Sequence, residues 1–221
     1  MSKRSSSILA AISGILGVAS LGVSFAINNG PPFDATIAQK IAFDDQNFAS
    51  ILWGAWLQAI GPVFIVLFAL HLVFLARANT RLAGWMTFFG AMTLMTVSLI
   101  EIVFYISALY DTPTVMVQIS YELISAVQHL YFIVAAPAFF IPLGIVILGS
   151  DVLPRLLGYL ALLLGAAFAI AGAATVLSLE IPTVVQASAS IQVLWWLAAA
   201  ITLIVRAGKA PATAPTKEQT A

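Results

Sequence analysis

The chain has 221 residues, of which 62% are hydrophobic and 8% are charged, and its mean hydropathy is +1.05. Because a soluble domain carries about 25% charged residues, so few charges cannot solvate a water-facing surface. The formal net charge is zero, which argues against a nucleic-acid partner, and the lack of cysteine excludes disulfides, thiolate metal sites and thiol catalysis. We expect one transmembrane domain over residues 1–221, with the lipid bilayer as its partner.

Six apolar stretches are long enough to cross a bilayer, which takes about 20 residues at a rise of about 1.5 Å each. They are residues 8–27, 49–76, 82–108, 123–149, 156–178 and 184–205. The sequence therefore predicts an all-α bundle of six transmembrane helices. One alternative concerns the first stretch, because Lys3 and Arg4 precede it and small residues end it, as in a signal peptide. Cleavage there would leave five spans and an external N-terminus.

The connection between the first two spans, residues 28–48, is the longest in the chain. Asp34 could cap a short interfacial helix in which Ile37 and Ile41 share one side. A flexible polar loop fits the same residues. At the other end of the chain, residues 210–221 have no apolar period and are expected to form a disordered cytoplasmic tail.

Lysine and arginine set the orientation, because they resist translocation across the membrane. Eight of the nine basic residues fall on one alternating side of the six spans, and only Lys40 falls on the other. We expect that side to be the cytoplasm, with both termini in it. Several acidic residues gather on the opposite, external side, namely Asp34, Asp44, Asp45, Asp111 and Glu180.

Two turns on the cytoplasmic side share a short pattern, RLAGW at 81–85 and RLLGY at 155–159. Spans two and three could therefore be a parallel copy of spans four and five, although any cytoplasmic helix start favours these residue types. With its surroundings over residues 123–176, the segment LPRLLGY at 153–159 resembles uncharacterised bacterial polytopic proteins of the DUF4386 type. The resemblance implies a bundle of six or seven helices in a bacterial plasma membrane, with no catalytic residues to carry over.

Ionisable groups at membrane depth are costly, so they are the first place to look for function. Two spans carry polar stripes at helical spacing: Ser98, Glu101 and Tyr105 on the third, and Glu122, Ser125 and His129 on the fourth. If Tyr105 and Tyr121 mark the external boundary, Glu101 lies about 6 Å below it and His129 about 12 Å below it.

We therefore predict an externally open polar cavity with Glu101 and His129 as a protonatable pair. The candidate ligand- or proton-binding residues are Glu101, His129, Gln58, Glu122, Gln192, Tyr105 and Ser125. The alternative is that Glu101 and His129 are neutral and hydrogen-bonded between helices, with Glu122 solvated at the interface. Nearby prolines, at 62, 137 and 142, should free backbone carbonyls that neighbouring groups must satisfy. Glycines 14, 17 and 22 and the Ala/Gly-rich fifth span predict close helix packing.

No cofactor or metal is predicted. A retinal Schiff base needs a lysine buried in the membrane, and the only lysine between the first and last spans, Lys40, lies in a connection. Bis-histidine haem needs His71 and His129 at one depth, but their positions along the spans place them well apart. The sequence motifs of nucleotide-binding loops and zinc proteases are missing. The first functional hypothesis is binding or transport of a small solute, ion or proton. The second is a membrane-embedded enzyme or lipid-ligand binder that uses Glu101 and His129 as acid and base. The third is an accessory subunit that docks a membrane partner, and a homo-oligomer stays open.

Overall fold

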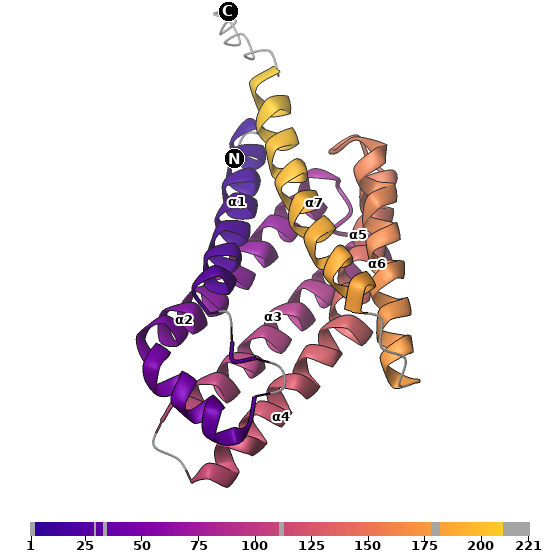
Figure 1. Ribbon diagram of the computed structural model, residues 1–221. Coiled ribbons are helices and arrows are strands. Elements are labelled where there is room, and N and C mark those ends of the chain that lie inside the picture. The colour runs from indigo at the N-terminus through magenta and orange to yellow at the C-terminus, as the bar shows by residue number, and fades with distance from the viewer. Residues whose placement is uncertain (1–2, 29, 33–34, 111–112, 178–181, 210–221) are drawn as a thin grey trace, which may run out of the picture.

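The computed structural model describes residues 3–28, 30–32, 35–110, 113–177 and 182–209, and this part of the chain is helical (Figure 1). The helices are α1 (Lys3–Ile27), α2 (Ile37–Leu75), α3 (Leu82–Leu109), α4 (Thr114–Leu130), the π-helix η1 (Tyr131–Ala135), α5 (Ala136–Leu148), α6 (Arg155–Val176) and α7 (Pro182–Lys209). Since α4, η1 and α5 run on as one span, six stretches are long and apolar enough to cross a membrane. The predicted all-α bundle of six spans is confirmed.

The second span begins well before its apolar part. The helix α2 bends at Asn47 (φ −113°, ψ 15°), and the segment before the bend is also helical. Its cap is Thr36: the Thr36 hydroxyl accepts from the Gln39 backbone N–H, and the Gln39 side chain accepts from the Thr36 N–H. The helix predicted within residues 28–48 is thus confirmed from Ile37 onward, and the loop alternative is wrong there. The N-cap of this helix is Thr36 in place of the predicted Asp34, which lies outside the described residues.

The start of α1 and the end of α7 lie at the same end of the bundle (Figure 1). Two arginines at this end donate hydrogen bonds to backbone carbonyls between α5 and α6. Arg81, before α3, donates to the carbonyl of Gly149 at 3.4 Å, and Arg206 of α7 donates to the carbonyl of Val152 at 3.0 Å. We call this the basic end, and we call the opposite end, which carries Lys40, Asp44 and Asp45 of α2, the acidic end. The predicted residues Asp111, Glu180 and Lys217 lie outside the described part of the chain.

The core is an aromatic cluster that joins α2, α5, α6 and α7. Its members are at most 3% exposed and pack with ring centroids 5.1 to 6.2 Å apart: Phe68, Phe139, Phe140, Phe168, Trp195 and Trp196. The Trp195 indole N–H also donates to the Leu157 carbonyl on α6 at 2.8 Å. Because lipid is as apolar as the core, the hydrophobic effect does not drive helices together within a membrane. Close packing and hydrogen bonds of this kind stabilise the bundle instead.

Glycines of α1 and α6 lie at close helix contacts, as predicted for most of them. A Cβ on Gly14 would stand 2.7 Å from the Phe68 ring, and one on Gly17 would stand 2.7 Å from the Ile65 side chain. Gly165 and Gly172 of α6 lie equally close to α5 and η1. Gly22 is different, since no described atom lies within 4 Å of its Cβ position, so its predicted packing role is wrong.

Two prolines each leave one backbone carbonyl without its helical hydrogen bond, and residues of α3 pack against both carbonyls. Pro62 lacks an N–H, so the Gln58 carbonyl one turn earlier has no helical donor, and the Ser98 hydroxyl donates to it instead at 3.1 Å. Pro142 likewise frees the carbonyl of Ala138, and Gly90 of α3 lies directly against it. The prediction that neighbouring groups satisfy such carbonyls is confirmed at Pro62.

Candidate functional site

Glu101 of α3 is held by amide groups from two neighbouring helices. The Gln58 Nε2 of α2 donates to Glu101 Oε2 at 2.7 Å, and the Gln128 Nε2 of α4 donates to Oε1 at 2.8 Å. The Gln58 side chain is only 4% exposed. Since both carboxyl oxygens act as acceptors, the arrangement suits an ionised carboxylate.

The backbone explains why Gln58 and Glu101 meet. Ser98 precedes Glu101 by almost one helical turn, and its hydroxyl donates to the Gln58 carbonyl that Pro62 leaves free. This bond fixes the register of α2 against α3. As a result, the Gln58 amide stands opposite the Glu101 carboxylate.

No basic side chain in the described part of the chain neutralises Glu101. Its hydrogen-bond partners are the two neutral amides. No lysine, arginine or histidine among the described residues interacts with its carboxylate. An unneutralised carboxylate inside a membrane bundle is costly. A group in this situation has a strong tendency to take up a proton or a cation.

The structure does not bring His129 to Glu101. His129 Nδ1 hydrogen-bonds to the Ser125 carbonyl of its own helix at 2.7 Å, and the His129 side chain is exposed. Glu122 is also exposed and accepts from Gln118, again on α4, at 2.9 Å. The stripe of Glu122, Ser125 and His129 therefore faces away from the bundle interior, and Gln128 is the α4 residue that reaches Glu101.

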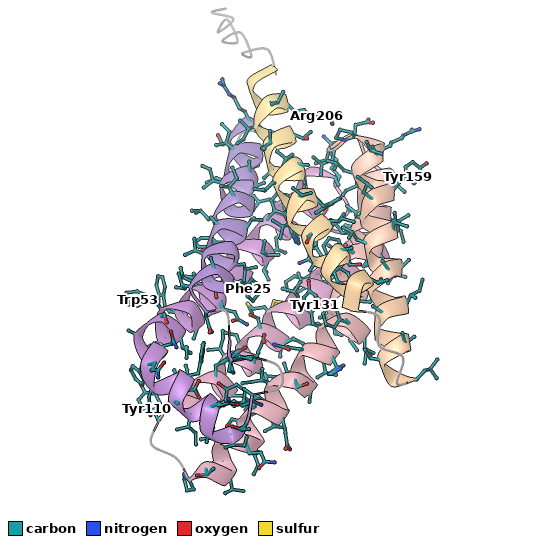
Figure 2. All side chains as sticks on the ribbon, in the orientation of Figure 1. Phe25, Trp53, Tyr110, Tyr131, Tyr159 and Arg206 are labelled. Atoms are coloured by element: carbon teal, nitrogen blue, oxygen red, sulfur yellow. The ribbon has the colours of Figure 1, made fainter. Side chains whose placement is uncertain are left out.

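Gln192, the candidate on α7, belongs to a separate contact. It accepts a hydrogen bond from the hydroxyl of Tyr131 in η1. Figure 2 shows Tyr131 toward the middle of the bundle, with Tyr110 toward the acidic end and Arg206 toward the basic end. Gln192 thus joins α7 to η1 and makes no described contact with Glu101.

A second polar group lies at the acidic end. Asp44 of α2 is 5% exposed, and its Oδ1 accepts from the Tyr121 hydroxyl of α4 at 2.7 Å. Its Oδ2 is buried and has no hydrogen-bond partner among the described residues. The Lys40 Nζ stands 4.7 Å from the centroid of the Tyr121 ring, a cation–π contact. Tyr105 of α3, another sequence-based candidate, lies within electrostatic range of both Glu101 and Asp44.

The polar hollow at this end has a volume of about 410 Å³ and is lined by Asp44, Asp45, Phe48 and Tyr110 together with apolar residues of α2, α3 and α4. A larger groove of about 590 Å³ lies between α3 and α5 and has an apolar lining. Neither hollow is lined by Glu101 or His129.

Two residues of these groups, Asp44 and Tyr121, were missing from the sequence-based candidates, and Gln128 stood out only as an amide at membrane depth. The signal for Gln128 was present, because it follows Tyr121 by seven residues and so shares a helix face with it. No comparable signal existed for Asp44, which stood in a segment that reads equally well as a loop.

No protein-family model, curated protein or solved structure matches this chain. The function is therefore argued from the geometry of the site.

Proposed function

We propose that this membrane protein binds a proton or small cation at Glu101 and couples this event to the binding or transport of a small solute. The observation that carries the proposal is a carboxylate held by Gln58 and Gln128, two neutral amides, with no basic partner in the described part of the chain. Uptake of a proton or cation removes the cost of that charge at membrane depth.

Protonation would also change how Glu101 holds its neighbours. The ionised carboxylate accepts from both amides, whereas the protonated group donates through one oxygen. One amide must then turn its oxygen toward Glu101. Because Gln58 lies on α2 and Gln128 on α4, the change acts on the two helices that carry Asp44 and Tyr121 at the acidic end. This supplies a physical route from the proton site to the hollow.

The same proposal places the acidic end outside the cell and both termini in the cytoplasm of a bacterium. It is supported by the basic residues, since Arg81 and Arg206 meet the same turn and the positive-inside rule assigns their end to the cytoplasm. The DUF4386 resemblance, which stays a prediction, agrees with a bacterial plasma membrane.

The orientation can be tested by cysteine labelling, because the native chain has no cysteine. Asp45 and Asn79 are both exposed and lie at opposite ends, on α2 and in the turn before α3. In intact cells, an impermeant maleimide is expected to label an Asp45→Cys chain. It should label an Asn79→Cys chain only after the membrane is permeabilised. The reverse pattern would place the termini outside.

The proposed activity can be tested with the full chain in liposomes that contain a pH-sensitive dye. A pH gradient imposed across the membrane should collapse faster than in empty liposomes, or the unfolding temperature should depend on pH if the protein binds protons without moving them. A gradient that decays at the empty-liposome rate, together with a pH-independent unfolding temperature, would overturn the proposal.

A further inference from the structure

The hollow at the acidic end combines carboxylates with aromatic rings. Asp44 and Asp45 form its acidic wall, and Phe48 and Tyr110 contribute a pair of rings with centroids 5.9 Å apart and planes at 89°. Its volume of about 410 Å³ is within the range of small-ligand pockets. We propose that this hollow binds a small primary alkylammonium ion.

Asp44 supplies the acceptor for the ammonium group. The side chain is 95% buried, since 5% is exposed, and it lies in the wall of the hollow. Tyr121 occupies Oδ1, while Oδ2 has no donor among the described residues. A buried acceptor without a donor is unfavourable, and an ammonium N–H would satisfy it.

The charges around the hollow favour one monovalent cation. Asp44 and Asp45 are its carboxyl groups, and Lys40 is the nearby basic residue. The Lys40 ammonium lies against the Tyr121 ring and forms no ion pair with either carboxyl group within the described residues. When both carboxyl groups are ionised, one lysine leaves one negative charge, and a cation bound beside Asp44 stabilises its ionised form.

The remaining walls favour an organic cation over a metal ion. Phe48 and Tyr110 offer ring faces suited to an ammonium group, and Ile41, Leu109 and Val117 offer apolar contact for a short alkyl chain. Among the described residues, no group of three or more His, Cys, Asp or Glu side chains could hold a metal ion. A primary ammonium with an alkyl tail matches both kinds of wall.

This inference goes beyond the proton site, because Glu101 does not line the hollow. The two proposals can therefore fail separately. Loss of alkylammonium binding would leave proton uptake at Glu101 intact. Glu101→Gln is expected to retain saturable alkylammonium binding, because it changes no wall of the hollow, although the coupling between the two sites shifts the affinity.

The test is calorimetric titration of the full chain in lipid nanodiscs with n-butylammonium chloride, with n-butanol as the uncharged analogue. Saturable binding is expected for the ammonium and none for the alcohol. Asp44→Asn should weaken binding by about tenfold or more, and Phe48→Leu by roughly threefold to tenfold. Glu122→Gln is the matched control: it removes one exposed carboxylate from outside the hollow and should leave the affinity unchanged.

Three results would overturn the inference. They are equal affinity for n-butanol, full affinity in Asp44→Asn, and displacement of the ammonium by an equimolar amount of sodium. Size-exclusion chromatography and circular dichroism check that each variant is folded. If Asp44→Asn does not fold, Phe48→Leu decides the question, because an unchanged affinity in that variant contradicts the role of the ring.

Discussion

Glu101→Gln is expected to abolish the pH-dependent step of the protein's activity while leaving the bundle folded. Glutamine has the shape of glutamate, and either Gln58 or Gln128 can rotate its amide to accept from the new NH₂ group. The hydrogen bonds between the three helices are then retained, but the protonatable group is gone. In the liposome assay we expect the rate to fall by about tenfold or more and to become independent of pH.

The matched control for this prediction is Glu122→Gln. Glu122 is exposed, and within the described residues its side chain hydrogen-bonds to Gln118 of the same helix, so the charge change is the same without the loss of a described hydrogen bond between helices. Its pH profile should match that of the unmodified protein. A normal pH profile in Glu101→Gln would remove Glu101 from the mechanism.

Gly90→Ala is expected to have a large effect on stability. A Cβ at this position would lie 2.2 Å from the Ala138 carbonyl oxygen and 2.5 Å from the Phe139 backbone nitrogen. Both atoms belong to the backbone of α5, so no side-chain rotation can relieve the clash, and α3 must move away. We expect a loss of about 3 kcal/mol or more in the free energy of unfolding, measured by denaturant titration in detergent micelles.

Gly22→Ala controls for the helix propensity of the substitution. The Cβ would meet no described atom within 4 Å, and alanine stabilises a helix by about 1 kcal/mol relative to glycine. This variant should therefore unfold at the same denaturant concentration as the native chain or slightly higher. If Gly90→Ala behaved like Gly22→Ala, the close approach of α3 and α5 would be wrong.

The spans could be predicted because the bilayer sets their length. The third span, expected at residues 82–108, is observed as Leu82–Leu109. The errors lie where a helix continues beyond its apolar part: α2 begins at Ile37 instead of residue 49, and α4 at Thr114 instead of residue 123. Hydropathy does not report these extensions, because their ends depend on caps and on packing against neighbouring helices.

The site could be predicted only in part. Glu101 and Gln58 were both among the sequence-based candidates, and the structure joins them. The stripe on α4 was real, but helical spacing shows that residues share a face without showing which way that face points. In a soluble protein the polar face points to water, whereas a membrane helix has apolar surroundings on every side. For this reason His129 was paired with Glu101, although Gln128 is the residue that reaches it.

The π-helix η1 (Tyr131–Ala135) lets this span hold one extra residue without turning α4 away from its partners. A π turn closes its hydrogen bonds one residue later than an α turn, so its five residues turn the chain about as far as four residues of an α-helix. Deletion of one residue within η1 is therefore expected to restore a regular α-helix while α4 and α5 keep their orientations. Gln128 would still reach Glu101 after such a deletion. The same insertion in a regular α-helix would turn one flank by about 100°, so η1 separates the length of this span from the direction in which its polar residues point.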